Sequence, residues 1–223
     1  MNMTTKERPI LFSVPMVRAI LDGRKTQTRR VVKPQLEGRW NCWLREGERG
    51  TEIHVCRREH ERGEDCEPEF FARCPYGSSG DRLWVREAHW IHESERIVAY
   101  RADGEMPKHM EGSRWRPSIH MPRWASRLLL EVTEVRVERL QEITEEGAIA
   151  EGVTASESVD HSTEGVRLGD GWILGPTTEW HSASGNFALL WDSFNDKRGH
   201  GWDENPWVWV VSFRRLQSQG RDG

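Results

Sequence analysis

The sequence predicts an α+β protein, a small mixed β-barrel with three short helices. Several segments alternate in hydrophobicity or are rich in β-branched and aromatic residues, as strands are. Only three short stretches show helical features, and they do not alternate regularly with the strands, which argues against a βαβ architecture. A barrel fits many strands and few helices best. An α+β sandwich is the competing arrangement.

The N-terminal part is expected to be a strand, a helix and a basic connection. Residues 10–14 are predicted to form the strand. Pro15 suits the first residue of a helix, where its missing N–H is not needed. An apolar stripe of helical period runs to Leu21, and Gly23 is expected to end the helix. Residues 23–30 then lead into the next strand, where side chains and backbone are able to face a ligand.

Four further segments are predicted to be strands. Residues 82–90 and 97–101 are expected to pair, and residues 128–140 alternate as a long strand. Residues 206–216 are a closing apolar strand, which we expect to be buried on both faces. The remaining two helices are expected at Thr144, as an N-cap, and after Ser184.

The chain is expected to form a single domain over residues 1–216, because one hydrophobic core accommodates a chain of 223 residues. Residues 35–75 are charged, poor in aliphatic side chains and hold every cysteine, so they are predicted to be an insertion. Residues 151–182, rich in Ser, Gly, Thr and Asp, are predicted to be a long loop. Residues 217–223 are predicted to be a disordered tail.

The charge of the chain limits its partners. A net charge of −4 argues against a general polyanion-binding protein, whose domain would be strongly basic. Residues 18–33 nevertheless carry six basic side chains against one acid, Asp22. This local excess favours a phosphate-bearing ligand, and a solvated basic face is the alternative.

The location expected from the sequence is the cytoplasm, with no membrane partner. Residues 1–9 are polar and charged, without the apolar region of a secretory signal. The longest apolar runs are far too short to cross a bilayer. Disulfides are disfavoured in a reducing compartment.

The four cysteines form a cluster, and no others occur in the chain. We expect them to hold a structural zinc ion, because tetrahedral thiolate ligation would stabilise a segment with few aliphatic residues. The ligands would be Cys42, Cys56, Cys66 and Cys74. No C-x₂-C pair is present, and His54 or His60 would be able to replace a thiolate. Unligated cysteines and disulfides are the alternatives.

Three segments in a fixed order resemble a known family. Residues 23–30 read Gly-Arg-Lys-Thr-Gln-Thr-Arg-Arg, and residues 80–87 read Gly-Asp-Arg-Leu-Trp-Val-Arg-Glu. The third segment is the strand over residues 206–215, which follows a Phe-Ala-Leu-Leu-Trp helix at residues 187–191. Together they resemble the ASCH branch of the PUA-like superfamily, in particular its phage and prophage members. The resemblance implies a PUA-like barrel with a pocket for a nucleobase, a nucleoside or RNA.

The resemblance also implies a catalytic set. Some bacterial PUA-like proteins of this type are amidohydrolases that deacetylate N(4)-acetylcytidine with a Lys, a Thr and a Glu. The matching residues are Lys25, Thr28 and Glu87. A threonine hydroxyl becomes nucleophilic when an adjacent base takes its proton, and a lysine with a lowered pKa is such a base. Glu87 would orient the lysine or act as an acid or base, unless it pairs with a neighbouring arginine.

The expected substrate-binding residues are Gly23, Arg30, Trp84 and Arg86. The guanidinium group of Arg30 is a planar fork suited to a phosphate or a base edge, and bases stack on exposed tryptophan rings. Solvated charges on a turn are the alternative for Lys25 and Arg30. Three functions follow: an amidohydrolase of N-acylated cytidine or a related modified nucleoside, a non-catalytic RNA- or nucleic-acid-binding module, and a phage accessory protein that acts through protein contacts.

Overall fold

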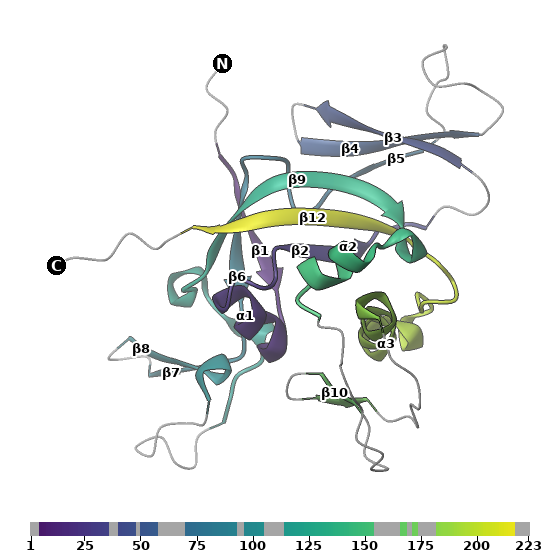
Figure 1. Ribbon diagram of the computed structural model, residues 1–223. Coiled ribbons are helices and arrows are strands. Elements are labelled where there is room, and N and C mark those ends of the chain that lie inside the picture. Colours follow the sequence, from purple (N-terminus) through teal and green to yellow (C-terminus); the bar gives the residue numbers. More distant parts are fainter. Residues whose placement is uncertain are drawn as a thin grey trace.

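The structure is a computed structural model with several sheets and three described α-helices (Figure 1). It confirms the α+β class. No helix within the described ranges is long and apolar enough to span a membrane. The structure describes residues 5–35, 40–47, 50–57, 70–92, 96–104, 114–153, 166–168, 171–173 and 182–216.

The main sheet has five strands, and only its first two neighbours, β1 and β6, are parallel. The strand order is β1 (Glu7–Leu11), β6 (Arg82–Arg86), β9 (Leu129–Arg139), β12 (Trp207–Leu216) and β2 (Gln27–Val31).

The expected barrel is not closed within the described residues. Strands β1 and β2 are the two edges of the sheet, and no backbone pairing joins them in the part of the chain described. A side chain spans this opening instead, because Arg30 Nη2 donates to the carbonyl oxygen of Leu11 at 2.7 Å. The opening between β1 and β2 is therefore bridged by a residue of the basic segment.

Strand β12 is buried on both faces over residues 208–211, as its apolar sequence predicts, whereas Arg214 and Arg215 near its end are exposed. Trp209, Val211 and Phe213 pack in one core cluster with Leu83 and other residues. Val208 and Val210, which alternate with them, pack in a second cluster under two helices. Because successive side chains of a strand point to opposite faces, one apolar strand supplies both cores.

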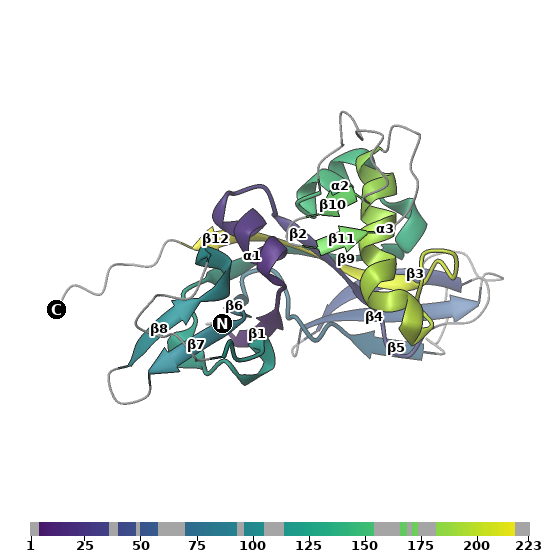
Figure 2. The same cartoon turned by 90° about the horizontal axis from the view of Figure 1, so that it is seen from below.

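The three predicted helices are all present among the described residues: α1 (Val14–Leu21), α2 (Glu145–Ala150) and α3 (Ala183–Asn195). Helix α1 begins one residue before Pro15. Helix α3 begins earlier than expected, because the hydroxyl of Ser182, and not of Ser184, caps it by accepting from the Gly185 N–H at 3.1 Å. Figures 1 and 2 show the three helices on one side of the β9–β12 ribbon.

A separate antiparallel sheet lies within the predicted insertion. It consists of β3 (Trp40–Gly47), β4 (Gly50–Arg57) and β5 (Phe70–Arg73), on the side of β9 away from the helices (Figure 1). Ile53 and Cys74 are buried in the same core cluster as residues of the main sheet. This part of the chain therefore packs against the main core.

The predicted strand over residues 82–90 ends at Arg86, and residues 89–92 form a second strand. That strand, β7 (His89–His92), pairs with β8 (Ile97–Tyr100) as a hairpin outside the main sheet.

Two short strands, β10 (Val166–Leu168) and β11 (Gly171–Ile173), occur within the predicted loop over residues 151–182. The predicted tail over residues 217–223 lies outside the described residues. The described 3₁₀ turns are η1 (Arg101–Asp103), η3 (Ser118–His120), η4 (Arg123–Ala125), η5 (Leu140–Glu142) and η6 (Asp196–Arg198).

Candidate functional site

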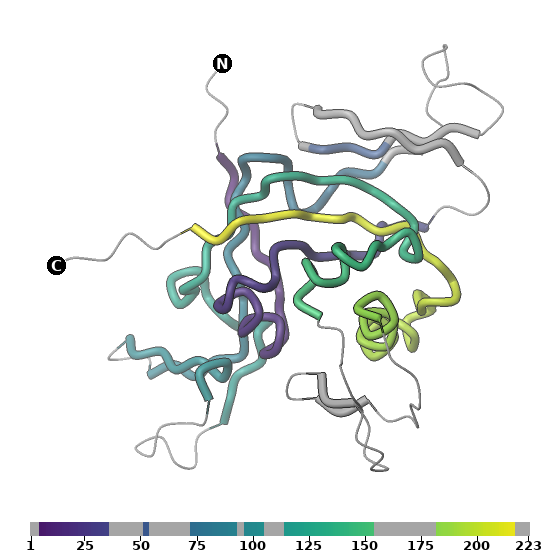
Figure 3. The backbone as a smooth tube through the Cα atoms, in the orientation of Figure 1, coloured from purple at the N-terminus to yellow at the C-terminus, as the bar shows by residue number. Residues whose placement is uncertain are grey.

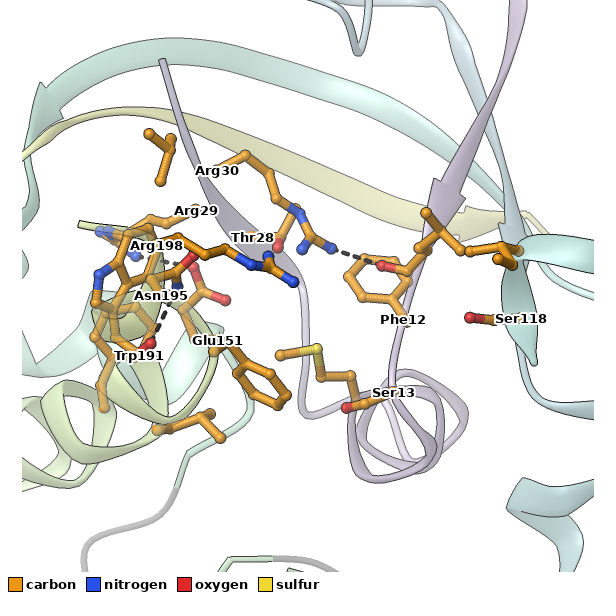
Figure 4. A pocket seen from close by; sticks show the side chains of 17 residues that line it. Phe12, Ser13, Thr28, Arg29, Arg30, Ser118, Glu151, Trp191, Asn195 and Arg198 are labelled. Atoms are coloured by element: carbon orange, nitrogen blue, oxygen red, sulfur yellow. Dashed lines mark hydrogen bonds and ion pairs between the residues drawn. The ribbon is translucent and has the colours of Figure 1, made fainter. Parts of the chain in front are cut away.

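A pocket of about 440 Å³ lies between the edge of β1, the edge of β2 and helix α3 (Figure 4). Its volume falls in the range of about 300–1,000 Å³ that small-molecule sites occupy. Apolar and largely aromatic side chains line it from two sides: Phe12 and Met16 from the end of β1 and from α1, and Phe187, Leu190, Trp191 and Phe194 from α3 (Figure 4). Its polar lining consists of Thr28, Arg29 and Arg30 of β2, Glu151 after α2, and Asn195 and Arg198 at the end of α3 and in η6.

The turn after α1 directs Lys25 into the protein. Gly23 has a left-handed φ of 75° and ends the helix, as predicted. The backbone N–H groups of Arg24 and Lys25 both donate to the carbonyl oxygen of Ala19 at 2.9 Å. The chain therefore turns back over the last turn of α1, and the Lys25 side chain is fully buried.

The end of α2 is joined to the start of β2. The Thr26 N–H donates to the carbonyl oxygen of Ala150 at 2.9 Å, and the backbone trace shows these two segments side by side (Figure 3). Gly152 ends the helix with a φ of 89°, in the left-handed region that favours glycine. This geometry places Glu151, the residue between Ala150 and Gly152, at the pocket.

Lys25 pairs with Glu151. The ammonium group lies 2.5 Å from Glu151 Oε2 and donates to the carbonyl oxygens of Gln27 and Glu151, each at 2.9 Å. Burial lowers the pKa of Lys25 below its usual 10.5, and the charge and hydrogen bond of Glu151 oppose that shift. The nearby charges of Arg30 and Arg29 lower the pKa further.

The ion pair continues into a buried network. Arg29 Nη2 lies 2.7 Å from Glu138 Oε1, and Arg29 Nη1 lies 3.4 Å from Glu151 Oε1. Arg136 Nε completes the row at 3.1 Å from Glu138 Oε2. Positive and negative groups alternate, so each buried charge has an opposite partner, as burial of charge requires.

Thr28 and Arg30 face the pocket from β2 (Figure 4). Thr28 is buried, and the Arg30 guanidinium lies 5.3 Å from the ring centroid of Phe12. Lys25 Nζ lies 5.6 Å from the same centroid. Two motif cations, Lys25 and Arg30, thus lie near Phe12. Thr28, Arg29 and Arg30 line the pocket, and Lys25 contacts Glu151 and Phe12, which also line it.

Glu87 lies in a different cluster. Its carboxylate accepts from Arg127 Nε at 2.9 Å and from Arg127 Nη2 at 3.1 Å, and Arg127 also pairs with Asp103. Burial raises the pKa of Glu87, although the hydrogen bond from Arg127 opposes the shift. Glu87 is not among the described residues that line the pocket, and the carboxylate that contacts Lys25 is Glu151.

The other expected binding residues lie outside the pocket lining. Trp84 and Arg86 are in β6, with the Arg86 guanidinium 5.5 Å from the Trp84 ring, and neither is among the described lining residues. Gly23 shapes the turn and does not line the pocket among these residues. Arg86 does connect to the site through its backbone, since its carbonyl oxygen accepts from the Phe12 N–H at 3.2 Å.

Several lining residues were not singled out as site residues from the sequence. The apolar stripe of α3 predicted a helix, but it gave no sign that Phe187 and Trp191 line a pocket. Glu151 stands directly before Gly152, the glycine that was predicted to end the helix. This position beside a helix end was the only sequence signal for a site residue there. Arg198, in η6, had none.

The expected zinc ligands are only partly described. Cys42 lies in β3 and Cys56 in β4, Cys66 lies outside the described residues, and Cys74 is buried after β5. Within the described ranges, no group of three or more His, Cys, Asp or Glu side chains is placed to hold a metal ion. The zinc site stays a prediction, and metal analysis of the purified chain tests it, with a stoichiometric amount expected.

The chain was compared with protein-family models, with curated proteins and with solved structures. No family model matches it, and neither other comparison found a significant match.

Proposed function

We propose that the chain is an ASCH-type protein of the PUA-like superfamily that binds a nucleobase or nucleoside, free or within RNA. The observation that carries the proposal is the pocket beside β2, in which Thr28, Arg29 and Arg30 of the Gly23–Arg30 motif line the same space as several aromatic side chains. Nucleobases have apolar faces that stack on aromatic rings and polar edges that need hydrogen-bond partners. The lining of this pocket offers both aromatic rings and hydrogen-bonding groups.

The polar side chains of the lining supply donors and acceptors. Arg30 donates, Glu151 accepts, and Thr28 and Asn195 are able to do both. Phe187 and Trp191 of α3 supply ring surface. A ligand that is flat, apolar on its faces and polar on its rim is the best match to this arrangement.

We also propose that the main sheet is a PUA-like barrel that opens at the β1–β2 edge. Strands β9 and β12 curve around the helices in Figure 1, and the pocket lies at the opening. In this proposal the ligand occupies the space where a backbone ladder would otherwise close the barrel.

Calorimetric titration with the common nucleosides and with a short single-stranded RNA tests the binding function. Replacing Arg30 by Gln should weaken the best ligand about 10-fold, the value of one charge-assisted hydrogen bond. The matched control is Lys33→Gln, which removes the same charge from an exposed residue outside the described pocket lining. The proposal fails if neither nucleosides nor RNA bind, or if both variants lose the same affinity.

The salt dependence of binding separates two forms of the proposal. A ligand held through RNA phosphates releases counterions, so its affinity falls steeply as salt rises. An uncharged nucleoside held in the pocket should show a nearly flat dependence. A flat dependence for RNA would contradict binding through its backbone.

Hydrolysis of an N-acylated cytidine is the second candidate function. It is favoured by Lys25, whose pKa is lowered by burial and which stands three residues before the pocket residue Thr28. Neutral Lys25 would take the Thr28 proton while Thr28 Oγ1 bonds to the acyl carbon, and the freed amine would leave with that proton. Water would then hydrolyse the acyl ester. Glu151, which contacts Lys25, would orient it.

Turnover of N(4)-acetylcytidine tests this second function. Lys25→Met and Thr28→Val should each lower the rate at least about 100-fold, the low end for a positioned acid or base. Thr28→Ser keeps a hydroxyl and should retain most of the rate. Glu151→Gln should lower the rate more than Glu87→Gln; the reverse order would favour Glu87 as the catalytic carboxylate. Absence of wild-type turnover would leave the binding function alone.

A further inference from the structure

The inner charges of the pocket are balanced. Lys25 is paired with Glu151, and Arg29 with Glu138, so each cation of this inner layer has its own carboxylate. Their side chains are almost fully buried, apart from that of Glu138, which is 14% exposed. A ligand therefore gains little attraction from this layer, because its positive charge is already neutralised.

Two further guanidinium groups of the pocket wall are not balanced within the described residues. Arg30 makes one hydrogen bond, to the carbonyl oxygen of Leu11, and its Nε is buried without a partner. Arg198 is exposed in η6, and no described carboxylate pairs with it. In Figure 4 both side chains extend toward the space inside the pocket, from β2 and from the turn after α3.

We infer that the ligand is a nucleoside that carries a phosphate group, with the phosphate held by Arg30 and Arg198. The inference rests on the proposed function and names its ligand class. A phosphate monoester carries a charge of about −1.5 to −2 at neutral pH and has three acceptor oxygens, which matches two unbalanced guanidinium groups. Guanidinium forks bind phosphate oxygens in pairs, and such charge-assisted bonds are short and strong.

The segment formed by α3 and η6 is able to contact both the base and the phosphate of such a ligand. Arg198 follows α3, whose Trp191 and Phe194 also line the pocket, so phosphate and base would contact neighbouring turns of one segment. The buried Arg30 Nε has no partner among the described residues, so a phosphate oxygen would supply the acceptor that buried donors normally have.

Calorimetric titration of the whole chain with cytidine and with cytidine 5′-monophosphate tests the inference at low ionic strength. The monophosphate should bind at least about 10-fold more tightly than cytidine, as expected for added charge-assisted hydrogen bonds. Arg198→Gln should reduce this ratio to about 3-fold or less, because it removes one of the two guanidinium groups. Lys197→Gln, an equal charge change at the adjacent exposed residue outside the described lining, should keep the wild-type ratio.

A dinucleotide separates free nucleotides from RNA as the source of the phosphate. If cytidylyl-cytidine, which has only an internal phosphodiester, binds as tightly as the monophosphate and depends equally on Arg198, the inference holds and RNA is the source. Weaker binding of the dinucleotide supports the inference with a free nucleotide as the ligand.

Three results would overturn the inference, and they are distinguishable from failure of the proposed function. Equal affinity for cytidine and its monophosphate would refute the phosphate site while the nucleoside pocket stands. A preference for the monophosphate that survives both Arg198→Gln and Arg30→Gln would place the phosphate elsewhere. Failure of all three compounds to bind would remove the proposed ligand class together with the phosphate site.

Discussion

Glu87 and Glu151 are both buried carboxylates with a basic partner, but their surroundings differ. The side chain of Glu151 is 4% exposed, and that of its partner Lys25 is 0% exposed. Glu87 is 1% exposed, but its partner Arg127 is 23% exposed and also pairs with Asp103. Glu151 lines the pocket, whereas Glu87 pairs with Arg127, whose guanidinium lies 4.0 Å from the ring centroid of Tyr100 in β8.

The difference shows how a fold selects the partner of a buried charge. Lys25 is 126 residues from Glu151 in the sequence, and α2 brings the two together through the hydrogen bond between Thr26 and Ala150. Glu87 is the carboxylate that the family resemblance assigns to the site, but it is satisfied by Arg127. A buried cation needs whichever carboxylate the fold places beside it, because leaving it unpaired is costly.

The largest expected effect is on stability when each carboxylate is removed. Glu151→Gln leaves the fully buried Lys25 without its carboxylate partner, so it should lower the free energy of unfolding by about 3–5 kcal/mol. Glu87→Gln leaves Arg127 partly exposed and still paired with Asp103, so the loss should be about 1–2 kcal/mol. Urea unfolding at neutral pH measures both. Equal losses would show that the two ion pairs do not differ as described.

The glycines beside the site give the next largest effect. A Cβ on Gly152 would lie 2.9 Å from the Cβ of Ala19 and 3.1 Å from the Cβ of Lys25, whereas a Cβ on Gly23 meets nothing within 4 Å. Both residues have positive φ, so each change to Ala should cost about 1–2 kcal/mol for the left-handed backbone. Gly152→Ala should cost at least about 1 kcal/mol more, because it also overpacks the wall behind Lys25. Chemical unfolding of the two variants checks the order.

The smallest effect is on the pH dependence of the free energy of unfolding, to which Lys25 and Glu87 should contribute with opposite signs. The pKa of Lys25 is lowered in the folded protein, so the unfolded chain binds more protons between that pKa and 10.5, and stability rises with pH through this window. The pKa of Glu87 is raised, so its contribution falls as the pH rises from 4.5 through the folded pKa.

Unfolding free energies measured over a pH series test this contrast. Wild type should gain stability relative to Lys25→Met as the pH approaches 10.5, and it should lose stability relative to Glu87→Gln above pH 4.5. A constant gap between wild type and Lys25→Met over the alkaline range would show that the lysine is not desolvated.

Local sequence patterns predicted the helices and strands, but they did not predict the contacts between segments far apart in the chain. The alternation of residues 128–140 and the apolar run of residues 206–216 were sufficient for β9 and β12, because periodicity reports burial. The end of α1 followed from Gly23, whose backbone freedom is a local property. The motif over residues 23–30 also identified a segment that does line the pocket.

The missing parts depend on which segments meet. The sequences of β1 and β2 do not indicate that these two strands form the edges of the main sheet without pairing with each other. The pairing of Lys25 with Glu151, and the position of Arg198 at the pocket, arise from segments far apart in the chain. The motif over residues 80–87 pointed to Glu87 because it matches the family's glutamate in the sequence. A sequence match does not reveal that the Glu87 carboxylate accepts its hydrogen bonds from Arg127 here.

A crystal structure of the chain with cytidine 5′-monophosphate tests the central claim most directly. We expect the nucleotide in the pocket beside β2, with its base against α3, a contact to Thr28 and its phosphate between Arg30 and Arg198. A nucleotide bound instead along β6, beside Trp84 and Arg86, or an empty pocket at a saturating concentration, would contradict the account.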